Sequence, residues 1–115
     1  MRNLLNAEEI VKEAFNRDAP LTDTDIEDLA TDRRWLDDDF VDLRRKFLER
    51  LQKKGYTREA AEMALRHADE YTKGISVVLS EKAPELLEET VKSIYPEALK
   101  ISEEWIKEYI RGMFR

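Results

Sequence analysis

The sequence predicts an all-α fold, a single small bundle of about five to six helices with orthogonal or irregular packing. Apolar residues recur at helical spacing along most of the chain, and residues suited to helix caps flank these segments. Only three Gly and three Pro are present, too few for many short strands and turns. With 115 residues, 42% of them hydrophobic, the chain has the size and apolar content of one domain spanning residues 1–115.

The first two expected helices are placed by their N-terminal caps. One begins at Asn6, which forms a capping-box pattern with Glu9, and it ends near Asp18. The second is short and follows Thr22, whose hydroxyl can cap it, with Ile26 on its apolar side.

The next two expected helices are placed by Gly residues as well as caps. A long helix begins at Asp37 or Asp38 and stops at Gly55, because Gly favours the left-handed conformation that ends many helices. Another begins after Thr57, and Gly74 is expected to end it in the same way.

Proline residues set the expected boundaries in the rest of the chain. Apolar residues keep helical spacing from Ile75 to Ile94 straight across Pro84. Proline costs about 3 kcal/mol inside a helix but fits a first turn. We therefore expect a short turn over 75–82, a helix from 84 to about 95, and a last helix that Pro96 opens. A single helix kinked at Pro84 is the alternative.

Composition narrows the class of protein. The absence of Cys excludes a disulfide framework and thiolate chemistry. No apolar run is long enough to span a membrane or to form a signal core, so we expect a cytoplasmic protein without a membrane partner. Few amides among many Glu, Lys and Arg residues are typical of thermophilic proteins, although short helical proteins share this bias.

Catalytic and metal-binding patterns find little support. His67 is the only histidine, and no nucleophile motif or glycine-rich phosphate loop accompanies it. The acidic run from Asp23 resembles a calcium loop only at its start, since Asp28 and Arg34 stand where that loop needs Gly and Glu. We therefore expect a protein that is not an enzyme and has neither cofactor nor metal.

Charge is distributed unevenly along the middle of the chain. Residues 18–42 contain ten acids and two bases, whereas residues 44–58 contain seven bases and one acid. Either block could dock on a macromolecule of opposite charge, or the two blocks could follow the helix dipoles and pair with each other. The candidate basic docking surface is Arg44, Arg45, Lys46, Arg50, Lys53, Lys54 and Arg58, and the candidate acidic surface is Asp23, Asp25, Asp28, Asp37, Asp38 and Asp39.

A stripe of large apolar residues runs along the last expected helix. Its candidate interface residues are Trp105, Tyr109, Met113 and Phe114. Aromatic residues and Met are enriched in interface cores, so this stripe could bind a partner or form a homodimer. The alternative is that these side chains fill the core of the domain itself.

The sequence thus favours a non-enzymatic protein–protein interaction or regulatory module that docks through a charged or apolar helical face. The alternative function is a nucleic-acid-binding module, because segment 40–74 has the outline of a helix-turn-helix and Arg58 begins its second helix. Nucleic acid is the less favoured partner, since the chain carries a net charge of −6.

Overall fold

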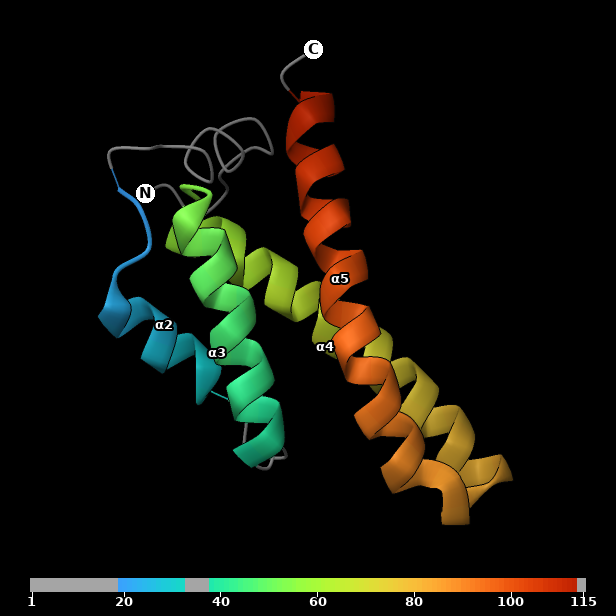
Figure 1. Ribbon diagram of the computed structural model, residues 1–115. Helices are drawn as coiled ribbons and strands as arrows, with labels where there is room; N and C mark the ends of the chain where they lie inside the picture. Colours follow the sequence, from blue (N-terminus) through green and yellow to red (C-terminus); the bar gives the residue numbers. More distant parts are fainter. Residues whose placement is uncertain (1–18, 33–37, 114–115) are drawn as a thin grey trace, which may run out of the picture.

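The computed structural model describes residues 19–32 and 38–113, with the side chains of 38, 39 and 113 excepted (Figure 1). These residues form four α-helices and one 3₁₀ turn, and none belongs to a β-sheet strand. The elements are α2 (Asp23–Ala30), α3 (Asp38–Lys53), α4 (Arg58–Lys82), η1 (Pro84–Leu86) and α5 (Leu87–Met113). The predicted all-α class is therefore confirmed, and the helix expected from Asn6 to Asp18 lies outside the described residues.

The expected count of five to six helices is not matched in the described part of the chain: the first expected helix lies outside it, and two expected boundaries are wrong. Helix α4 continues through Gly74, and α5 continues through Pro96. Glycine costs a helix only about 1 kcal/mol and so does not by itself end one. Proline costs about 3 kcal/mol, but Tyr95 and Ala98 on either side of Pro96 are fully buried, and their packing offsets the loss.

The other expected boundaries that fall within the described residues are confirmed. The Thr22 hydroxyl accepts a hydrogen bond from the Asp25 amide, and the Asp25 carboxylate accepts one from the Thr22 amide, which completes a capping box. Thr57 caps α4 by accepting from the Ala60 amide. Pro84 ends the long α4 segment by opening η1, so the chain divides here rather than bending as one helix.

The end of α3 is a hydrogen-bonded glycine turn. Gly55 has φ of 85° and donates to the Gln52 carbonyl, while the next amide, that of Tyr56, donates to the Leu51 carbonyl. These two bonds satisfy carbonyls that the helix leaves without partners. A residue with a Cβ adopts this backbone conformation only at a cost.

Two glycine substitutions should therefore change stability in opposite directions. We expect Gly55→Ala to lower the free energy of unfolding by about 1 kcal/mol, because its φ is positive. Gly74→Ala should raise it by about 0.5–1 kcal/mol, because Gly74 is helical and a Cβ there meets no atom within 4 Å. Urea denaturation of both variants measures the difference, and equal signs would contradict the assignment.

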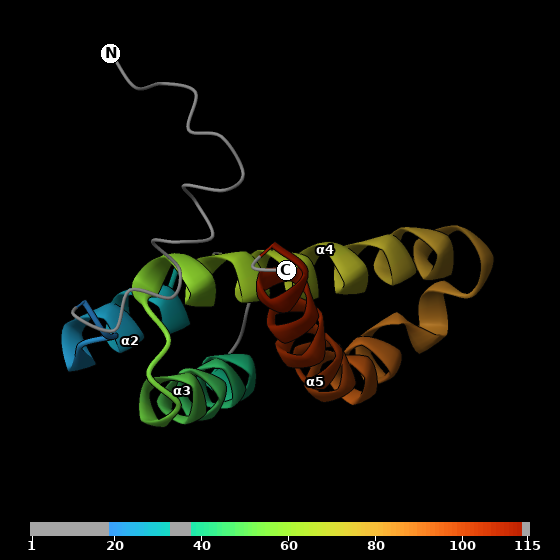
Figure 2. The same cartoon turned by 90° about the horizontal axis from the view of Figure 1, so that it is seen from above.

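Helices α4 and α5 form a long antiparallel hairpin, and α2 and α3 pack beside one end of it. Figure 2 shows the η1 end of this hairpin projecting well beyond α2 and α3. Helix α4 contributes fully buried alanines to the packed end, including Ala61 and Ala64, and such small side chains allow helices to approach closely. The largest buried apolar side chains around it are Phe47, Leu48, Leu51, Tyr95, Ile106 and Ile110.

Among the described helices, none combines the length and the hydropathy that a membrane crossing requires.

Candidate functional site

Arg44, expected on the basic docking surface, is buried, with only 2% of its surface exposed. Its guanidinium donates to the Leu29 and Ala30 carbonyls at 2.7 and 3.2 Å and to both Asp69 carboxylate oxygens at 2.9 and 3.1 Å. It also donates to the Tyr95 hydroxyl at 2.7 Å. Helix α2 has no basic residue in its last turn, so Arg44 from α3 supplies the positive charge that its terminal carbonyls favour. The expectation that Arg44 faces a partner is therefore wrong.

Arg58 is on the surface but is held by three carboxylates. It donates to Glu62 at 2.8 Å, to Asp25 at 2.9 Å and to Asp28 at 3.3 Å. These hydrogen bonds, first that to Glu62, raise the pKa of Arg58 above its ordinary value. The pKa of Asp25 is lowered, mainly by the hydrogen bond from the Thr22 amide. Two members of the expected acidic surface thus neutralise one member of the expected basic surface.

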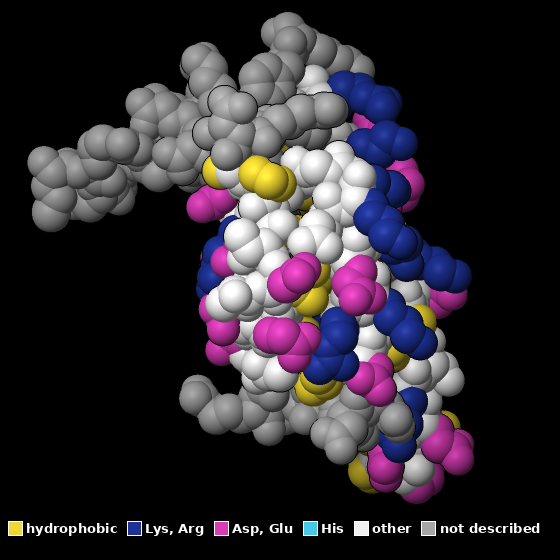
Figure 3. Space-filling view, turned by 60° about the vertical axis from the view of Figure 1, so that its left-hand side comes forward, with side chains coloured by type: hydrophobic (Ala, Val, Ile, Leu, Met, Phe, Trp, Pro, Cys, Tyr) yellow, Lys and Arg dark blue, Asp and Glu magenta, His cyan; other side chains and the backbone are white. Residues whose placement is uncertain are grey.

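Arg45 shows the same internal pairing. It donates to Glu27 at 2.6 Å and to Asp42 at 2.7 Å. Figure 3 shows acidic and basic side chains next to one another on one face of the molecule. The acidic and basic blocks therefore contact each other through Arg45 and Arg58, as the alternative interpretation of the pattern proposed.

Glu103 of α5 binds two more members of the basic block, Arg50 at 2.6 Å and Lys54. Burial by itself would raise the pKa of Glu103, but the hydrogen bonds and charges of Lys54 and Arg50 outweigh it and lower the pKa. Of the seven basic residues, Lys46 and Lys53 alone make no ion pair within residues 19–32 and 38–113, and both are exposed. They lie seven residues apart on α3, which places them two turns apart on the same face of the helix.

The lowered pKa of Glu103 makes a pH dependence testable. A carboxylate with a lowered pKa stabilises the fold above its ordinary pKa of 4.5, and this contribution is lost as pH falls through the lowered value. We expect Glu103→Gln to lower the free energy of unfolding by about 1 kcal/mol at pH 7 and by much less at pH 3. Urea denaturation at both pH values measures this, and an undiminished difference at pH 3 would contradict the assignment.

The acidic candidates do not come together as one described surface. Asp25 and Asp28 bind Arg58, and Asp23 accepts a hydrogen bond from the Gln52 side chain at 3.1 Å. Asp37 and the side chains of Asp38 and Asp39 lie outside the part that the structure describes, as do Phe114 and the side chain of Met113.

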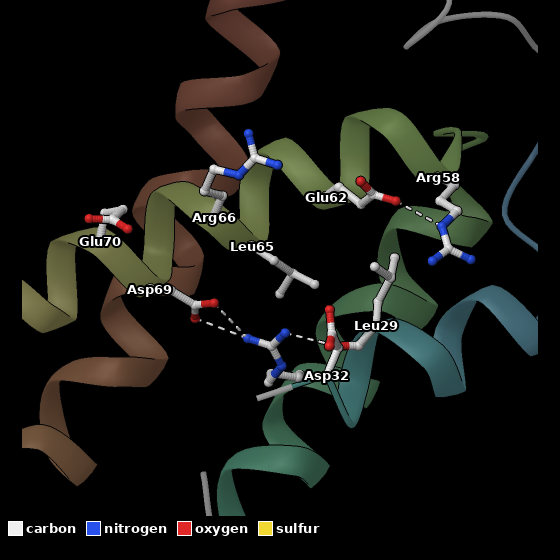
Figure 4. A pocket seen from close by; sticks show the side chains of 9 residues that line it. Leu29, Asp32, Arg58, Glu62, Leu65, Arg66, Asp69 and Glu70 are labelled. Carbon is white, nitrogen blue, oxygen red and sulfur yellow. Dashed lines mark hydrogen bonds and ion pairs between the residues drawn. The ribbon is translucent and has the colours of Figure 1, made fainter. Parts of the chain in front are cut away.

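A pocket of about 330 Å³ lies between the end of α2 and the exposed side of α4. Figure 4 shows Asp69 at one end of it and the paired Arg58 and Glu62 at the other. Arg44 pairs with Asp69 and Arg58 with Glu62 in this pocket, whereas Asp32, Arg66 and Glu70 make no ion pair within the described residues. No set of three acidic or histidine side chains in the described residues could hold a metal ion.

His67 forms an aromatic contact between the two hairpin helices. Its ring stacks on that of Trp105 with centroids 4.3 Å apart, and its Nδ1 lies 2.7 Å from the Ser102 hydroxyl. The Trp105 ring in turn contacts Tyr109 at 5.5 Å. Both candidate interface aromatics are partly buried against the core but not fully enclosed.

The His67–Trp105 stack lies near one end of an apolar stripe along one side of the hairpin. On α4, Tyr71 and Val78 follow His67 at four and eleven residues and share its face; on α5, Ile101 precedes Trp105 by four. Because the helices run antiparallel, both series proceed from the stack toward η1 on the same side. We call this surface the hairpin flank; its residues are His67, Tyr71, Ile75, Val78, Ile94, Ile101, Trp105 and Tyr109.

The hairpin flank is partly exposed along its whole length. Tyr71, Val78 and Ile101 are 44%, 52% and 43% exposed, and the other five residues are of intermediate exposure. From Tyr109 to Ile94 the flank extends about 22 Å at the helical rise of 1.5 Å per residue. The α4 half of the flank was not predicted from the sequence, because Gly74 was expected to end that helix. The spacing of Tyr71, Ile75 and Val78, four and three residues apart, was the available signal.

Comparison with known proteins gave no match of this chain to a family model, to a curated protein or to a solved structure.

Proposed function

We propose that this chain is a non-enzymatic protein–protein interaction or regulatory module that docks a partner protein on the hairpin flank. The single observation that carries the proposal is the exposure of Tyr71, Val78 and Ile101, each about half exposed, on the apolar stripe that helical spacing defines around the His67–Trp105 stack. Isolated apolar residues on a surface are ordinary, but contiguous apolar patches mark interaction sites. The stripe also contains Trp105 and Tyr109, and aromatic residues of this kind anchor interfaces.

The charged surfaces support the proposal less well than the flank does. Arg44 is enclosed, and Arg45, Arg50, Lys54 and Arg58 are bound to carboxylates of the same chain. A partner that used these groups would have to displace existing ion pairs. A partner that docks on the apolar flank would bury apolar side chains without breaking an ion pair.

Binding of nucleic acid is the weaker alternative. Arg58 begins the second helix of segment 40–74 and would have to reach a phosphate or base edge. It instead donates to Asp25, Asp28 and Glu62, whose charges would repel a polyanion. No observation in the described residues favours this function over docking of a protein.

Two neighbouring valines provide a matched test. Val77 and Val78 are each 52% exposed, but only Val78 shares the face of Tyr71. A photoreactive benzoylphenylalanine at Val78, introduced in cells that make the protein, should cross-link a defined partner protein, whereas the same group at Val77 should not. Untagged wild-type chain should compete for this cross-link, and the Val78→Lys, Ile101→Lys double variant should not. Equal cross-linking from both positions, or none from either, would overturn the proposal.

A further inference from the structure

We infer that the occupant of the hairpin flank is a basic amphipathic helix of the partner protein. This inference rests on the proposed function and adds the chemistry of the partner. It depends on three features of the flank: the hydrogen bonding of its backbone, its length, and the charges along its two edges.

The backbone of the hairpin leaves a partner only side chains to bind. The flank lies on α4 (Arg58–Lys82) and α5 (Leu87–Met113), whose backbone amides and carbonyls are engaged in helical hydrogen bonds except at the helix ends and at Pro96. An added strand needs a sheet edge with available hydrogen-bonding groups, and no described residue belongs to a sheet. A helix needs only an apolar face, and about 15 residues of helix match the flank of about 22 Å.

The α5 edge of the flank is acidic. Glu97 and Glu104 stand four residues before and three residues after Ile101, and Glu108 stands three residues after Trp105. These spacings place all three carboxylates beside the apolar stripe, and all three residues are exposed. Lys100 and Arg111 approach Glu97 at 3.5 Å and Glu108 at 3.1 Å, while Glu104 makes no ion pair with any described residue.

The α4 edge has the same character. Glu70 and Glu81 follow His67 and Val78 by three residues, and both are exposed and without an ion pair in the described part of the chain. Lys82, four residues after Val78, is the basic residue beside this stripe. An apolar flank with acidic edges on both sides is complementary to a helix whose apolar face is bordered by Lys or Arg.

The same charges disfavour a second copy of this chain as the occupant. In a symmetric pairing of two hairpin flanks, the edge that carries Glu97, Glu104 and Glu108 would face another acidic edge whichever helices met. Each copy also has a net charge of −6. Like charges across an interface suppress such a pairing.

Two model peptides test the inference on the full chain. Each is a 16-residue helix with the same leucine face, and their polar faces carry either Lys or Glu. We expect the Lys peptide to bind roughly tenfold or more tightly than the Glu peptide by calorimetry, with an affinity that falls as salt is raised. In amide NMR spectra the shifts should concentrate around Tyr71, Val78 and Ile101. Equal affinities, or a preference for the Glu peptide, would overturn the inference.

Charge reversal tests whether the acidic edges of the flank cause the preference for the Lys peptide. The double variant Glu81→Lys, Glu104→Lys should lose most of the preference for the Lys peptide, whereas Glu49→Lys, an exposed reversal on α3, should keep it. An unchanged preference in the double variant would overturn the inference. A dimer of this chain in sedimentation would also overturn the inference if Val78→Lys dissociates it and Val77→Lys does not. The occupant of the flank would then be a second copy of the chain.

The failure of this inference and the failure of the proposed function are distinguishable. If neither peptide binds while the Val78 cross-link to a partner protein persists, the flank is a docking surface but the partner is not a basic helix. If the Val78 and Val77 cross-links do not differ, the docking surface itself is wrong.

Discussion

Replacement of Arg44 by methionine should lower the free energy of unfolding by about 3–5 kcal/mol. The substitution leaves Asp69 in the interior without its guanidinium partner and removes the donors to the Leu29 and Ala30 carbonyls. Native domains are stable by only about 5–15 kcal/mol, so much of the chain should be unfolded at moderate urea concentrations. Urea denaturation followed by circular dichroism measures the change.

The adjacent arginine is the matched control. Arg45 is also bound to two carboxylates, but its side chain is 33% exposed and Glu27 and Asp42 are 56% and 65% exposed. Surface pairs of this kind contribute little, so Arg45→Met should cost far less stability than Arg44→Met. If the two variants were equally destabilised, the burial of Arg44 would not explain the loss of stability in Arg44→Met.

A double variant separates the ion pair from simple packing. In Arg44→Met, Asp69→Leu no buried carboxylate remains without a partner, and a well-packed apolar pair can replace a buried ion pair at little cost. We expect this double variant to recover at least half of the stability that Arg44→Met loses. A loss equal to the sum of the two single substitutions would contradict coupling between Arg44 and Asp69.

Sequence reasoning located those features that neighbouring residues determine. Thr22, Thr57 and Gly55 act through atoms within a few residues of themselves, so their patterns predicted the ends of α2, α3 and α4. Gly74 and Pro96 carried the same kind of local signal, but packing across the hairpin overrode it. Local patterns thus indicate where a helix is allowed to end, whereas tertiary contact decides whether it does.

The sequence alone did not reveal which charged residues are buried, which are paired and which are exposed. Arg44 and Arg45 are adjacent and chemically identical, yet one is buried and the other is on the surface. Arg44 reaches Asp69 and Tyr95, 25 and 51 residues away, and such contacts have no periodicity by which to recognise them. For this reason the seven-residue basic docking surface could not be separated in advance into buried, paired and exposed members.

Ile106 and Ile101 on α5 should differ strongly in how much they contribute to stability, because Ile106 is in the core and Ile101 is on the hairpin flank. Ile106 is fully buried, and Ile106→Ala should lower the free energy of unfolding by about 2–5 kcal/mol through lost burial and the cavity that remains. Ile101 lies five residues earlier and is 43% exposed, so Ile101→Ala should cost less than about 1 kcal/mol. Parallel urea denaturation of the two variants measures the contrast.

The contrast tests the premise of the docking proposal, since the two variants remove the same atoms from the same helix. If Ile101→Ala is nearly neutral for folding, the fold does not require a large apolar side chain at that position, and the side chain is available to bind a partner. The same variant should then weaken partner binding while leaving the folded structure intact. If Ile101→Ala instead destabilises the chain as much as Ile106→Ala, the hairpin flank belongs to the core, and the docking proposal loses the observation on which it rests.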